Sequence, residues 1–93
     1  MIVMKYTVLI TRTFQKSFHE LPKNTQDRIR KHLQQLKEDP LTPRPHCNIK
    51  VLQDTNPRKY RLRVGEYRII YLIEKKKVNV IELIKREIKY SRL

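Results

Sequence analysis

The stretch Lys59–Tyr71, KYRLRVGEYRIIY, contains the pattern that decides the fold. Its first part, Tyr60–Val64, alternates large apolar and basic residues, as a strand with one buried face does. Tyr67–Ile73 follows as a nearly continuous apolar strand. The pair Gly65–Glu66 between them fits a two-residue type II′ turn with glycine at the first central position. We therefore predict a β-hairpin, and its short loop fixes the register of the two strands.

This register brings three arginines together. It pairs position 63 with 68 and position 61 with 70, so Arg61, Arg63 and Arg68 share one face of the sheet. Like charges opposed across two strands are destabilising. A guanidinium group, however, matches two phosphate oxygens at once, so the cluster favours a phosphate-binding role. The alternative is that these are solvated arginines whose aliphatic stems cover apolar neighbours.

The N-terminal half predicts one strand and two helices. A strand over Tyr6–Ile10 precedes a helix that Thr11 or Thr13 caps and Pro22 ends. The apolar face of this helix consists of Phe14, Phe18 and Leu21. A second helix runs from Asn24 to Pro40, with a capping-box-like start and an apolar stripe of Ile29, Leu33 and Leu36.

The C-terminal half reads as sheet after a proline-rich loop over 41–48. A short strand is predicted over Ile49–Leu52 and a nearly continuous apolar strand over Val78–Ile84, and Lys75–Lys77 forms a hairpin tip. The order β-α-α-β-β-β-β predicts an α+β fold. We expect an antiparallel sheet with an antiparallel helix hairpin on one face, and a short C-terminal tail, in a single domain over residues 1–93.

The composition points to an anionic partner. The chain has 22 Lys+Arg against 9 Asp+Glu, a formal net charge of +13. Nucleic acid, an anionic membrane surface or an acidic protein would offset this charge. The single glycine excludes glycine-rich nucleotide loops, and the single cysteine excludes a disulfide framework. No apolar run is long enough for a membrane span, Lys5 interrupts any signal-peptide core, and we expect a cytoplasmic protein.

The histidines do not predict a metal site. His19 and His32 lie next to apolar helix positions, and His46 is a sequence neighbour of Cys47. A zinc site needs about four ligands, and neighbours on a strand point to opposite faces. We therefore expect neither a metal ion nor a small-molecule cofactor.

Lys59–Tyr71 resembles the most recognisable stretch of the RelE/ParE toxin superfamily, and the tail Ile84–Tyr90 resembles its closing motif, a basic pair followed by tyrosine. The Leu21–Pro22 break and the Asp39–Pro40 helix end also match. The resemblance covers nearly the whole chain and implies the toxin of a type II toxin–antitoxin pair. Its partner would be a RelB-like antitoxin, acidic and partly disordered when free.

Within the superfamily, the sequence is most similar to RelE-like toxins of the archaeal type. Such toxins enter the ribosomal A site and cut mRNA: the 2′-hydroxyl attacks the adjacent phosphate, leaving a 2′,3′-cyclic phosphate and a 5′-hydroxyl. By this resemblance Arg68 and Arg86 bind the scissile phosphate and Tyr90 contacts a nucleotide. Tyr90 also suits base stacking. Further phosphate-binding candidates are Lys59, Lys85 and Lys89.

One departure from the family concerns the base. Arg61 and Arg63 stand where some RelE-like toxins have catalytic lysines, and arginine stays protonated. Lys59, Lys85 or Tyr90 is then the base, or the enzyme works by orientation and electrostatics. Two other functions stay open: a ParE-like inhibitor of DNA gyrase, and a non-catalytic RNA-binding or ribosome-associated protein.

Overall fold

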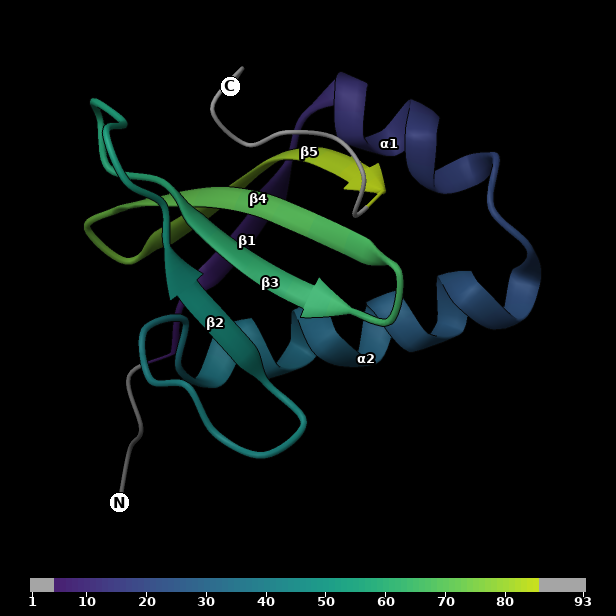
Figure 1. The fold of residues 1–93 in the computed structure, drawn as a ribbon, viewed down its shortest axis with the longest axis horizontal. Coiled ribbons are helices and arrows are strands. Elements are labelled where there is room, and N and C mark those ends of the chain that lie inside the picture. Colours follow the sequence, from purple (N-terminus) through teal and green to yellow (C-terminus); the bar gives the residue numbers. More distant parts are fainter. Residues whose placement is uncertain (1–4, 86–93) are drawn as a thin grey trace.

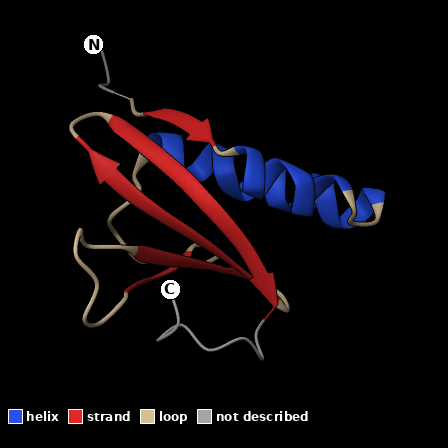
Figure 2. Ribbon diagram, turned by 90° about the horizontal axis from the view of Figure 1, so that it is seen from above, coloured by secondary structure: helices blue, strands red, loops and turns tan. Residues whose placement is uncertain are grey.

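The computed structural model describes residues 5–85. They form β1 (Thr7–Ile10), α1 (Arg12–His19), α2 (Lys23–Glu38), β2 (Asn48–Val51), β3 (Tyr60–Val64), β4 (Tyr67–Glu74) and β5 (Lys77–Lys85). The strands make one sheet in the order β1-β5-β4-β3-β2 (Figure 1). Both helices lie on one side of the sheet (Figure 2), which confirms the α+β class predicted from the sequence.

The sheet is antiparallel from β2 to β5, and β1 is the exception. β1 pairs parallel to β5, with Thr7 opposite Lys77 and Ile10 opposite Val80. Parallel neighbours need a crossover connection. Both helices and three strands separate β1 from β5 in the chain, and this connection is long enough for the two strands to pair in parallel.

Helix α1 begins and packs as its sequence predicts. Thr11 is the N-cap, and its hydroxyl accepts a hydrogen bond of 3.1 Å from the backbone N–H of Phe14. Phe14 and Phe18, one turn apart, are buried and stack with ring centroids 5.9 Å apart. This face packs against β5.

Helix α2 begins one residue earlier than the sequence predicts. Pro22 is its N-cap and makes no side-chain capping bond. Asn24 lies inside the helix, where its Oδ1 accepts from the neighbouring Thr25 N–H at 2.9 Å. The capping-box prediction was therefore wrong at this position, because the fixed φ of proline already starts the turn.

The main core lies between the helices and the sheet. Buried side chains come from both helices, from the loop before β2 and from all strands from β2 to β5: Phe14, Phe18, Ile29, Leu36, Cys47, Ile49, Leu62, Val64, Ile69, Tyr71, Val78, Val80 and Leu83. The apolar stripe predicted for α2 is present, with Leu33 packed at its edge. The opposite face of the sheet holds a smaller buried cluster of Leu52, Ile70 and Ile84.

The hairpin of β3 and β4 has the predicted register. Val64 pairs with Tyr67, and Gly65 has φ +59°, which an L side chain rarely adopts. The next hairpin turns at Lys75 and Lys76 alone, since Lys77 already pairs with Glu74 as the first residue of β5. No helix within residues 5–85 is long and apolar enough to cross a membrane.

Candidate nucleic-acid interface

A row of polar and basic side chains crosses the sheet on the face opposite the helices. Arg63 pairs with Arg68 across β3 and β4, and Asn48 of β2 pairs with Arg63 from the other side. In the neighbouring row Lys50 pairs with Arg61. The face that carries these residues is called the arginine face below. Its three arginines are the ones that the hairpin register predicted to lie together.

Arg68 is the most enclosed member of the arginine face. It is 8% exposed, and its Nη1 donates to the carbonyl oxygens of Gly65 at 3.0 Å and Tyr67 at 3.1 Å. An arginine has five N–H donors. These two contacts orient the guanidinium at the hairpin end of the sheet, and its other N–H groups are not bonded to any group of residues 5–85.

Arg61 is hydrogen-bonded to the edge strand β2. Its Nη2 donates to Oδ1 of Asn48 at 2.7 Å. Its Nε is buried and has no hydrogen-bond partner among residues 5–85. A buried donor without a partner costs free energy. A ligand whose acceptor atom bonded to this nitrogen would recover that free energy.

The arginine face is basic, although Glu82 of β5, which pairs with Ile70, lies on the same face. Within residues 5–85 two salt bridges form, Lys5 with Glu38 and Arg30 with Asp27, and neither involves an arginine of this face. Two neighbouring guanidinium groups without a carboxylate between them repel each other. A phosphate group placed against Arg63 and Arg68 would remove this repulsion.

The remaining candidate residues are Lys59, Lys85, Arg86, Lys89 and Tyr90. Lys59 is the residue before β3, the strand that carries Arg61 and Arg63, and lies at the end of β3 away from the Gly65 turn. Lys85 ends β5 opposite Tyr67, so it belongs to the helix-covered face and lines a pocket with Ser17 of α1 and the turn that follows this helix. Arg86, Lys89 and Tyr90 lie outside the described residues.

Three features of this face were missed by the sequence reasoning. They are the Asn48 contact with Arg61, the basic Lys50 beside it, and the apolar cluster of Leu52, Ile70 and Ile84. The long connection between β2 and β3 hides the register of β2, so no local signal pairs Asn48 with Arg63. The apolar cluster gives the arginine face a partly hydrophobic floor.

Other ionisable groups of the interior are structural. The Tyr71 hydroxyl donates to the Pro40 carbonyl at 2.7 Å, and burial raises its pKa, so it stays protonated. Burial also raises the pKa of the Cys47 thiol, which opposes nucleophilic reactivity. His46 beside it is exposed. Among residues 5–85 no three His, Cys, Asp or Glu side chains gather as metal ligands.

Asn48→Ala is expected to weaken RNA binding by up to about tenfold, because a freed Arg61 must be ordered on binding at a cost of about 0.5–1.5 kcal/mol. Fluorescence anisotropy with a single-stranded RNA measures this change. Asn24→Ala, which removes an exposed asparagine on the helix side, is the matched control and should bind as the wild type. Equal affinity of Asn48→Ala and the wild type would contradict the role of Asn48.

The fold and the arginine face define a class, the RelE/ParE toxin superfamily. The family model described as ParE toxin of type II toxin–antitoxin system, parDE, matches residues 8–90. The chain belongs to this family and is the toxin of a type II toxin–antitoxin system. No curated protein sequence matches the chain.

Solved structures agree with this assignment. The archaeal RelE–RelB complex of Pyrococcus horikoshii OT3 contains a chain 30% identical to this one, with a TM-score of 0.77, covering 89% of this chain and 97% of that one. The RelBE2 toxin–antitoxin complex of Mycobacterium tuberculosis gives 24% identity, a TM-score of 0.73, and coverage of 88% and 99%. The RelB–RelE complex of Methanococcus jannaschii gives 22% identity, a TM-score of 0.71, and coverage of 85% of this chain and 91% of that one. For the M. tuberculosis and M. jannaschii chains the similarity is one of fold.

Proposed function

We propose that the protein is a ribosome-dependent mRNA endonuclease that acts in the cytoplasm. The observation that carries this proposal is the row of Arg63 and Arg68 with Arg61 beside it, because none of these arginines has a carboxylate partner among residues 5–85. A protein that only binds another protein needs no such receptor for phosphate. The similarity to an archaeal RelE chain supports the same conclusion.

The chemistry proposed for this face is attack of an RNA 2′-hydroxyl on the adjacent phosphate. A 2′,3′-cyclic phosphate forms, the P–O5′ bond breaks, and the 5′-oxygen leaves as a hydroxyl. The phosphorane gains negative charge in the transition state, and fixed guanidinium donors stabilise it. Arg68, which two backbone carbonyls already orient, needs little reorganisation for this role.

Proton transfer needs a different group, since arginine does not release its proton at neutral pH. Tyr90 and Lys59 are the candidates for the base. Lys85 is a weaker candidate, because its pairing with Tyr67 puts it on the other face from Arg68. Most of the rate enhancement then comes from Arg61, Arg63 and Arg68. They orient the 2′-hydroxyl in line with the phosphate and stabilise the charge of the transition state.

The proposed inhibitor of this activity is an acidic antitoxin. The similar chains from P. horikoshii, M. jannaschii and M. tuberculosis were each crystallised as a complex with a RelB-type partner. A net charge of +13 makes an acidic partner electrostatically favourable. Such a partner would neutralise the toxin until it is removed.

The proposal is tested by mapping mRNA ends on translating ribosomes incubated with the purified toxin. We expect cuts inside the A-site codon, with 2′,3′-cyclic phosphate and 5′-hydroxyl ends. The description of the matching family names ParE, so gyrase inhibition is the second candidate. Intact mRNA together with loss of gyrase supercoiling activity would favour that candidate and reject the nuclease.

Binding to RNA is expected to weaken steeply with salt. If Arg61, Arg63, Arg68 and Arg86 each neutralise one phosphate of single-stranded RNA, log affinity falls with log salt at a slope of about −3. A fourfold rise in potassium chloride at constant magnesium then weakens binding about fifty-fold. Anisotropy titrations measure the slope, and an affinity that stays flat would contradict binding through the arginine face.

A further inference from the structure

A second guanidinium group lies against the turn between β3 and β4. It belongs to Arg28, an exposed residue of α2, the helix that passes beside this turn (Figure 1). A methyl group built on Gly65 would lie 3.1 Å from Nη2 and 3.5 Å from Nη1 of Arg28. Gly65 has φ +59° and is the only glycine of the chain. Both the turn and the close approach of Arg28 therefore depend on the missing side chain.

Arg28 and Arg68 approach this one residue from different layers of the fold. Arg68 is on the arginine face, and its Nη1 donates to the Gly65 carbonyl oxygen at 3.0 Å. Arg28 comes from the helix layer and contacts the Cα side of Gly65. Arg63 pairs with Arg68 in the second residue pair from the turn. The basic surface of the arginine face therefore continues around the end of the sheet as far as Arg28.

Arg28 has no carboxylate partner within residues 5–85. Neither of the two salt bridges formed there involves it, and Asp27, the residue before it, pairs with Arg30 at 3.2 Å. Glu66 of the turn is exposed and forms no salt bridge with the described residues. Arg28 and Arg68 thus lie close together with no acidic side chain bonded to either. An anion bound beside the turn would reduce the repulsion between them.

We propose that Arg28 binds a second phosphate of the RNA strand, the neighbour of the scissile phosphate. The RNA backbone then leaves the arginine face across the turn at Gly65, and the planar guanidinium accepts two oxygens of this phosphate. The inference rests on the proposed function, which puts the scissile phosphate at Arg68. Its test measures binding and needs no cleavage.

The contact with Gly65 makes Arg28 better suited to this role than a solvated arginine. A long side chain loses rotamer freedom when a ligand immobilises it, and this loss weakens binding. Packing against the turn already restricts the guanidinium of Arg28. Less freedom is therefore left to lose when the phosphate binds.

The test uses the full chain and a 2′-deoxy dinucleotide, which lacks the attacking hydroxyl and has one internal phosphate. It is compared, by NMR titration at constant ionic strength, with the same dinucleotide carrying a second phosphate at its 5′ or 3′ end. We expect the second phosphate at one of the two ends to strengthen binding to the wild type by about tenfold. No gain at either end would overturn the proposal.

Arg28→Ala should abolish this gain and leave the affinity for the dinucleotide with one phosphate within about twofold of the wild type. A variant that keeps the gain, or that loses affinity for both ligands equally, would overturn the proposal. Arg28→Lys should keep only part of the gain, because an ammonium group lacks the bidentate fork. Urea unfolding checks that both variants are folded.

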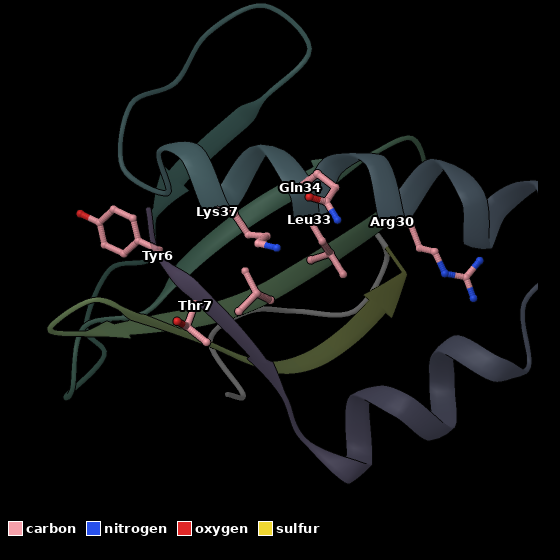
Figure 3. Close-up of a pocket in the computed structure, with 7 residues that line it drawn as sticks. Tyr6, Thr7, Arg30, Leu33, Gln34 and Lys37 are labelled. Carbon is pink, nitrogen blue, oxygen red and sulfur yellow. The ribbon is translucent and has the colours of Figure 1, made fainter. Parts of the chain in front are cut away.

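Arg30→Ala is the matched control, since it removes the same charge from the same helix. Arg30 lies two residues further along and lines a pocket between α2 and β1 together with Leu33 and Lys37 (Figure 3). Residues two apart on a helix do not share a face. Arg30→Ala should therefore keep the gain from the second phosphate, and an equal loss in both variants would show an effect of net charge alone and overturn the proposal.

Mapping of mRNA ends on ribosomes, carried out in parallel, separates this inference from the proposed function. A toxin that cuts mRNA while Arg28→Ala keeps the gain rejects the Arg28 site alone. A toxin whose gain depends on Arg28 but which leaves mRNA intact rejects the nuclease alone.

Discussion

Replacing Arg86 with alanine is expected to slow mRNA cleavage by about 10²–10³-fold and to abolish growth arrest. Arg86 is the residue after the end of β5 and lies outside the described residues. We propose, from the family resemblance, that Arg86 contacts the scissile phosphate. Removing one donor that stabilises charge in the transition state has an effect of this size in other enzymes. Single-turnover cleavage on programmed ribosomes measures it.

The controls separate chemistry from folding. Arg86 follows the last strand, so its replacement should change the free energy of unfolding by about 0.5 kcal/mol or less. Arg86→Lys should restore activity only in part, because an ammonium group keeps the charge but loses the bidentate fork. If Arg86→Ala stays fully toxic, the phosphate-binding role is wrong and gyrase inhibition becomes the better proposal.

The arginine face could be predicted from the sequence because it depends on a local constraint. A two-residue turn at Gly65 leaves a single register for the hairpin, and strand alternation then fixes which side chains share a face. The structure pairs Arg63 with Arg68 as this argument requires. Helix α1 could be predicted for the same reason, since Thr11 and Phe14 lie within one turn.

Features that depend on distant parts of the chain could not be predicted. The parallel pairing of β1 with β5 joins residues such as Thr7 and Lys77, and no local pattern specifies it. The contact of Asn48 with Arg61 depends on the register of β2, which a long loop leaves undetermined. Lys85 is at the expected end of the sheet, but its face follows from the β4–β5 register, which shifts at Ile70 and Tyr71.

The position of β1 in the sheet shows the same limit. Tyr6–Ile10 was predicted as a strand, but its position at the edge of the sheet is a property of the whole topology. Only that position leaves Leu9 and Ile10 exposed.

Arg68→Ala is expected to differ sharply from Arg63→Ala, although the two residues are paired across the hairpin. Arg68 is buried and donates to two carbonyls, so its loss should cost about 1–3 kcal/mol of unfolding free energy and slow cleavage about 10²–10³-fold. Arg63 is exposed. Its loss should change stability by about 0.5 kcal/mol or less and mainly reduce the salt slope of RNA binding, by about 0.7.

Arg68→Lys separates charge from geometry at this position. Lysine keeps the positive charge, but its point-like ammonium cannot bind the Gly65 and Tyr67 carbonyls and still present a planar fork to phosphate. We therefore expect binding of RNA close to that of the wild type and a cleavage rate, at saturating ribosome, close to that of Arg68→Ala. Urea unfolding checks that the variant is folded. A wild-type rate for Arg68→Lys would show that charge alone suffices, and the fixed guanidinium would then have no part in catalysis.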